Sequence, residues 1–125
     1  MSAKTVKLSV PAEPEFARVV RMTAANLTVC CEMSIDDVED ARMAAEEGFV
    51  YACASGIDVC DVEFTIDGPE VTMAFSLGDK LEEAEDVESL DLVEALLAAI
   101  CDDSYITEDD SRLVLVKRIG DAHGE

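Results

Sequence analysis

The sequence predicts an α/β protein, a two-layer sandwich in which helices cover one face of a mixed, mostly antiparallel sheet. Two observations lead to this prediction. Segments in which apolar residues alternate with polar ones are interspersed with segments whose apolar residues recur every three or four positions. Read in order, these segments predict strand, helix, helix, strand, strand, helix, strand and strand. The 125 residues contain no repeat or linker, so we expect one domain over residues 1–125.

The first strand and the first helix are predicted from two neighbouring patterns. Val6, Leu8 and Val10 alternate with polar residues, which is typical of a strand, and Pro11 ends that pattern. An apolar stripe with helical spacing then predicts an amphipathic helix over about residues 14–31.

A second helix is predicted between a capping pattern and a glycine. Ser34 can cap the helix, and Asp37 stands three residues later, as in a capping box. The apolar stripe that follows continues for five turns, and Gly56 is a plausible stop.

The second half of the chain predicts two hairpins separated by a helix. Residues 59–77 alternate in polarity around an Asp-Gly-Pro turn at 67–69, which predicts a hairpin. An acidic loop over 79–91 leads into a strongly apolar helix over about 90–101. The segments "SYIT" and "RLVLVKRI" flank an acidic turn and predict the last hairpin, whose Lys117 and Arg118 we interpret as edge or solvent-facing charges.

Composition excludes several classes of partner. Nine Lys and Arg residues against 29 Asp and Glu residues make the net charge −20, which argues against nucleic acid and against anionic membranes. Five cysteines lack the spacing of a zinc site, and the single histidine, His123, lies in the polar tail, so no metal centre is expected. The start of the chain does not have the pattern of a signal peptide, and we expect a cytoplasmic protein with free thiols.

Three stretches resemble a known bacterial family. "LSVPAEPEFARVVRMTAANL" is similar to the first strand and helix of the anti-sigma-factor serine kinases, which belong to the histidine-kinase-like (GHKL, or Bergerat-fold) ATPase superfamily. "SIDDVEDARMAAEEGFVYACASG" resembles the signature helix of that family, and "DLVEALLAAICDDSYITEDDSRLVLVKRI" its last helix and closing strand pair. The resemblance covers most of the chain and implies a Bergerat-like sandwich.

The signature helix of the family carries a Glu that polarises the attacking group and, four residues on, an Asn that holds magnesium. Glu47 matches the Glu, but Tyr51 occupies the position of the Asn. A bulky neutral phenol is a poor ligand for Mg²⁺, which prefers compact oxygen donors in octahedral array. Phe49 and Tyr51 either line a remnant nucleotide pocket or fill the space that the nucleotide would occupy.

Two further features of the family are altered. Its Asp-x-Gly motif, whose Asp binds the adenine amino group, is matched by Ser76 and Gly78, so the charged acceptor is missing. Its long glycine-bearing lid is replaced by the stretch 79–91, which carries seven acidic residues and would repel a triphosphate. Tyr51, Ser76 and Gly78 would then be the residues of a remnant nucleotide pocket.

The resulting prediction is a regulatory protein-binding domain that resembles anti-sigma factors and has lost ATP-dependent kinase activity, without a cofactor. The resemblance implies a sigma factor or a small STAS-domain antagonist as the protein partner, and a capacity to form homodimers. Exposed residues of the first helix, such as Glu15, Arg18 and Arg21, are candidate contacts, and association with a basic partner should weaken with salt.

Two other interpretations stay open at this point. The alternative function is an active ATP-dependent serine/threonine kinase that acts on a STAS-domain antagonist. It would use ATP and Mg²⁺, with Glu47 as the base and Glu46 or Asp79 in place of the missing magnesium ligand. The third interpretation is a structural domain that acts only within a larger assembly.

Overall fold

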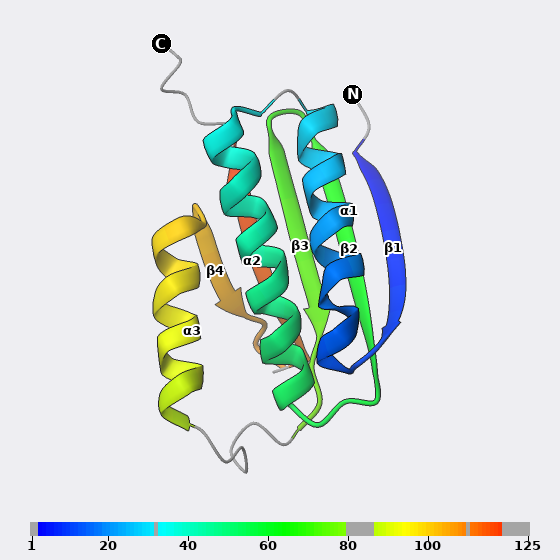
Figure 1. The fold of residues 1–125 in the computed structure, drawn as a ribbon, viewed down its shortest axis with the longest axis vertical. Coiled ribbons are helices and arrows are strands. Elements are labelled where there is room, and N and C mark those ends of the chain that lie inside the picture. Colours follow the sequence, from blue (N-terminus) through cyan, green and yellow to red (C-terminus); the bar gives the residue numbers. More distant parts are fainter. Residues whose placement is uncertain (1–2, 32, 80–86, 110, 119–125) are drawn as a thin grey trace.

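The computed structural model describes residues 3–31, 33–79, 87–109 and 111–118. Five strands form one sheet, and three α-helices lie on one face of it, so the chain is a two-layer α+β sandwich (Figure 1). The element order agrees with the prediction. The elements are β1 Lys4–Pro11, the 3₁₀ helix η1 Pro14–Phe16, α1 Ala17–Cys30, α2 Ile35–Ala54, β2 Val59–Asp67, β3 Glu70–Ser76, α3 Val87–Ile100, β4 Asp103–Ile106 and β5 Arg112–Arg118.

The sheet has the strand order β1-β2-β3-β5-β4, and each of its four neighbouring pairs is antiparallel. The expectation of a mixed sheet is therefore wrong for the described strands. The reason is the topology of the connections. Two antiparallel helices between β1 and β2 reverse the chain direction, and β5 lies between β3 and β4, which run in the same direction, so that these two strands never pair.

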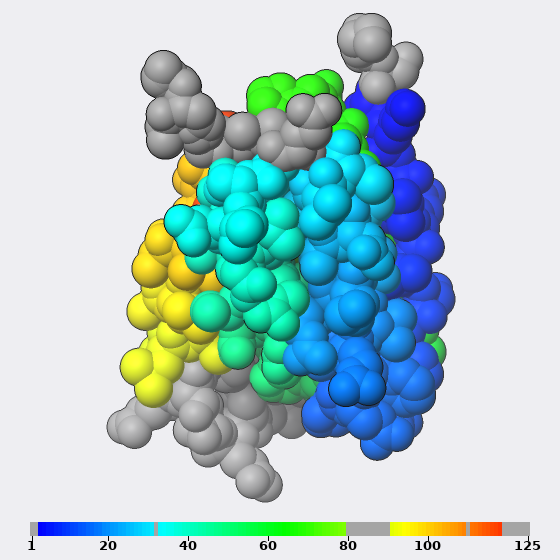
Figure 2. All heavy atoms as spheres, turned by 45° about the horizontal axis from the view of Figure 1, so that its top comes forward, coloured from blue at the N-terminus to red at the C-terminus, as the bar shows by residue number. Residues whose placement is uncertain are grey.

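The helix layer begins with α1 and α2, which pack side by side over the sheet and form a continuous surface (Figure 2). The predicted start of α2 is confirmed, because the Ser34 hydroxyl accepts a hydrogen bond from the Asp37 N–H at 3.1 Å. The guanidinium of Arg21 on α1 lies 3.1 Å from the carboxylate of Glu46 on α2 and links the two helices.

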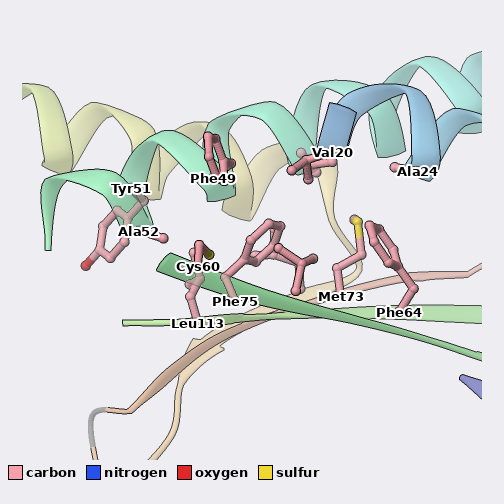
Figure 3. Packing of buried hydrophobic residues seen from close by; sticks show 14 of the residues in the cluster. Val20, Ala24, Phe49, Tyr51, Ala52, Cys60, Phe64, Met73, Phe75 and Leu113 are labelled. Atoms are coloured by element: carbon pink, nitrogen blue, oxygen red, sulfur yellow. The ribbon is translucent and has the colours of Figure 1, made fainter. Parts of the chain in front are cut away.

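The core lies between the helices and the inner face of the sheet (Figure 3). Phe49 of α2 lies over Phe75 of the sheet, Phe64 lies further along beside Met73, and all three rings are fully buried. Gly48 allows this close packing, because a Cβ atom there would lie 2.7 Å from the Phe75 ring. Phe49 is therefore a core residue of the sandwich.

Two expectations about the second half of the chain change in the structure. The helix α3 begins at Val87, so the end of the stretch 79–91 is helical rather than loop, while 80–86 lie outside the described residues. Lys117 is neither an edge charge nor solvent-facing: β5 is an inner strand, and the Lys117 side chain is only 10% exposed on the helix side of the sheet.

Candidate functional site

Glu47 and Tyr51, the two residues that the family resemblance singles out, lie near the C-terminal end of α2. Glu47 and Tyr51 are one helical turn apart and therefore share a face of the helix. Glu47 is half-buried, and its pKa is raised by that burial and by the neighbouring charge of Glu46. A raised pKa is compatible with a general base, but it is equally expected of any carboxylate that packs on a strongly acidic protein.

Tyr51 has a specific partner on another helix. Its hydroxyl donates a hydrogen bond to Oε2 of Glu94 on α3 at 2.8 Å, and its ring is 3% exposed. Burial, this hydrogen bond and the charges of Glu94 and Asp91 raise the pKa of Tyr51 well above its usual range. The phenol is thus neutral at physiological pH and acts as a donor that ties α2 to α3.

Ser76 does not lie beside Tyr51. Its side chain points to the open face of the sheet, where its hydroxyl accepts a hydrogen bond from the Asp61 N–H at 2.8 Å. It lines a shallow cleft of about 340 Å³ on that face together with Lys7, Ser9 and Arg112. The structure therefore separates Ser76 from Tyr51 by the thickness of the sheet, and the two cannot contact one ligand from the helix side.

Gly78 lies on the helix side, next to the end of α2. Its N–H donates a hydrogen bond to the Ser55 hydroxyl at 2.7 Å. A Cβ atom at Gly78 would lie 2.5 Å from the Ser55 carbonyl oxygen, so only glycine allows this backbone approach. The preceding residue, Leu77, is buried in the core cluster. Gly78 consequently has a packing role that requires no nucleotide, and the neighbour that faces the core is apolar.

The described residues do not suit a magnesium nucleotide at this place. Tyr51, which the resemblance aligns with the metal-holding Asn of the family, has a hydroxyl that is already bonded to Glu94. Glu46, one substitute considered for the ligand, is paired with Arg21. Nor does any group of three His, Cys, Asp or Glu side chains within the described part of the chain come together as a metal site. We therefore derive no step of phosphoryl transfer from this geometry.

A cleft of about 340 Å³ lies beside this site, between α3 and the last two strands. It is called the α3–β4 groove below, and its lining residues are Glu94, Leu97, Ser104, Tyr105, Ile106 and Leu113. Glu94 thus has two roles, since the same carboxylate accepts the Tyr51 hydrogen bond. The sequence could not indicate this pairing, because Tyr51 and Glu94 are 43 residues apart and no motif connects them.

The candidate contacts on the first helical segment differ in availability. Glu15, which lies in η1, and Arg18 of α1 are exposed. Arg21 is only 26% exposed and is held by Glu46. A partner that docks on this part of the helix layer would therefore meet Glu15 and Arg18 first.

Comparisons with known proteins do not assign the chain to a family. No protein-family model matches the sequence, and no curated protein matches it either. Among the described helices, none is both long and apolar enough to cross a membrane.

Proposed function

We propose that this chain is a regulatory protein-binding domain with a Bergerat-like fold, related in design to anti-sigma factors and without kinase activity. The observation that carries the proposal is the hydrogen bond from Tyr51 to Glu94. The buried neutral ring of Tyr51 occupies the position that the resemblance assigns to the magnesium ligand, and its hydrogen bond joins α2 to α3. Phosphoryl transfer depends almost entirely on positioned metal ions and charge, and a neutral phenol bonded to Glu94 is a poor ligand for the magnesium ion.

The charge of the chain favours a basic partner. With a net charge of −20, the protein would attract a cationic surface of a sigma factor or of a STAS-domain antagonist and repel an acidic one. Contacts between exposed charges are screened over about 8 Å at physiological ionic strength. The proposed interaction should therefore be strongest at low salt.

The first test is a titration with Mg-ATP, in which binding is measured by calorimetry and by thermal melting. We expect no heat of binding and no rise in Tm at millimolar nucleotide, because nothing at Tyr51 holds the metal. A ligand at about one hundred times its Kd would stabilise the native state by about 2.7 kcal/mol, so binding at micromolar affinity could not be missed. Such binding would contradict the proposal and favour the kinase alternative.

Two variants sharpen that titration. Tyr51→Asn restores the residue type that holds magnesium in the family, whereas Ser76→Asp adds a carboxylate on the open face of the sheet. If the pocket is otherwise lost, neither variant binds Mg-ATP. Nucleotide binding by Tyr51→Asn alone would show that only the metal ligand is missing, and Ser76→Asp serves as the matched control because it lies on the other face.

A separate measurement tests whether the chain binds a partner protein. Purified sigma factors and STAS-domain proteins from the same organism are titrated against the chain by calorimetry, without nucleotide. We expect one of them to bind, with an affinity that falls as salt is raised from about 50 to 200 mM. Arg18→Glu should change that affinity at least about threefold if α1 is the contact face. Failure of every candidate to bind would overturn the anti-sigma-factor-like role.

A further inference from the structure

The edge strand β4 has backbone groups that point away from the sheet. In an antiparallel ladder, opposite residues alternate between pairs that exchange hydrogen bonds and pairs that do not. The Thr107 N–H donates a hydrogen bond to the Arg112 carbonyl at 3.0 Å. Two residues earlier in the ladder, the backbone N–H and C=O groups of Tyr105 therefore also face β5. Ser104 and Ile106 therefore direct their N–H and C=O groups to the free edge, and no hydrogen bond among the described residues uses these groups.

The same two residues border the α3–β4 groove. The side chains of Ser104 and Ile106 line this cleft, opposite Glu94 and Leu97 of α3. Figure 1 shows α3 in front of the sheet and beyond β4, at the end of the strand order. A sixth strand added to β4 would thus lie under α3, with alternate side chains directed into the groove.

The surroundings of the groove are acidic. Glu94 and Asp91 of α3 are exposed carboxylates on the helix side, and Asp103 of β4 is an exposed carboxylate on the opposite face of the strand. The arginines of the neighbouring strand are engaged elsewhere, Arg112 with Glu63 and Arg118 with Glu70. Lysine or arginine side chains on the added strand would find acidic partners here, whereas acidic ones would be repelled.

The other edge of the sheet lacks these features. The strand β1 carries Lys4, Lys7 and Pro11, which are residue types that protect an edge from strand addition. The strand β4 carries neither lysine nor proline. The two edges therefore differ in the way expected if only one of them receives a partner.

We propose that the free edge of β4 and the α3–β4 groove form a docking site for an extended basic peptide of a partner protein, which adds to the sheet as a sixth strand. Backbone hydrogen bonds to Ser104 and Ile106 supply affinity, and an apolar side chain enters beside Leu97. Basic side chains two positions before and after it, on the same face of the added strand, meet Glu94. The inference deepens the proposed protein-binding role and rests on it. Its test uses another ligand and other residues than the nucleotide test, so the failure of each can be told apart.

The experiment measures binding of a short fluorescent peptide, Lys-Thr-Val-Thr-Lys, blocked at both ends, whose valine and two lysines share one face of an extended strand. Binding is followed by anisotropy and by amide chemical shifts of the full chain. We expect saturable binding and the largest shifts at Ser104 and Ile106. The same peptide with glutamate in place of lysine, or with alternate amides N-methylated, should bind at least about tenfold more weakly. Absence of saturation at about 1 mM, or shifts centred on another surface, overturns the proposal.

Two variants locate the site. Ser104→Pro removes one edge N–H without touching the ladder to β5 and should weaken binding at least about tenfold. Glu94→Gln keeps an acceptor for Tyr51 and removes the charge, so affinity should fall about three- to tenfold. Glu13→Gln, at the exposed residue that precedes η1, should not change the affinity. Unchanged affinity in Glu94→Gln contradicts the site even if the proline variant fails to fold. A chain that self-associates through β4, with an oligomer abolished by Ser104→Pro, would assign the edge to a second copy and overturn the peptide proposal.

Discussion

Replacing Lys117 with methionine is expected to lower the free energy of unfolding by about 3 kcal/mol. The Lys117 ammonium lies 3.3 Å from Oδ2 of Asp40, 3.6 Å from Oδ1 of Asp37 and 3.1 Å from the Ile100 carbonyl oxygen. It thereby joins β5 to the first turns of α2 and to the end of α3, where helix carbonyl groups lack intrahelical partners. Methionine retains most of the aliphatic stem but removes the cation beside the buried carboxylate of Asp37 and the half-buried carboxylate of Asp40.

The matched control for this prediction is Lys7→Met on the edge strand β1. The Lys7 ammonium lies 3.9 Å from Glu63, but its side chain is 76% exposed, and exposed ion pairs contribute little to stability. We expect that variant to change the free energy of unfolding by no more than about 0.5 kcal/mol. Urea unfolding of both variants, with unchanged m-values, makes the comparison.

A triple variant separates charge from shape at the same place. Lys117→Met combined with Asp37→Asn and Asp40→Asn removes the cation and both anions together. If the cost of the single change comes from unbalanced buried charge, the triple variant recovers at least about half of it. A triple variant as unstable as Lys117→Met alone would show that the loss comes from packing instead.

Lys117 also shows what sequence patterns leave undetermined. Leu113, Leu115 and Lys117 alternate along β5 and must share one face, and that face is the core face in the structure. The pattern therefore contained a sign that Lys117 points inward. The interpretation as an edge charge failed because strand order depends on contacts between distant segments, and β5 lies between β3 and β4. The carboxylates that stabilise Lys117 are 77 residues or more away in the chain.

In the candidate site too, some features could be predicted from local sequence signals and others depend on contacts between distant segments. The helix that carries Glu47 and Tyr51 could be predicted with its cap, because capping and apolar spacing are local signals. The face of Ser76 could also have been read from local alternation, since Val71, Met73 and Phe75 are the buried residues of β3. The hydrogen bond from Tyr51 to Glu94 and the groove under α3 could not, because both form only when α3 packs against α2 and β4.

Replacing Phe49 with alanine is expected to lower the free energy of unfolding by about 3–5 kcal/mol, the range for removing a fully buried aromatic ring. The sequence left two interpretations of Phe49, a residue that lines a nucleotide pocket or a residue that fills space. In the structure the ring is 0% exposed and lies among the inner residues of the sandwich. The variant would create a cavity under α2 that the surrounding side chains cannot close.

The neighbouring position supplies the control and decides between the two interpretations. Val50 is 37% exposed on the outer side of α2, so Val50→Ala should cost no more than about 0.5 kcal/mol. If Phe49 lined an open pocket instead, its loss would resemble that of Val50, because an exposed ring returns little free energy on folding. A cost near 4 kcal/mol for Phe49→Ala, without new affinity for Mg-ATP, would place the ring in the structural core. A cost below about 1 kcal/mol would reopen the space beneath α2 as a ligand site.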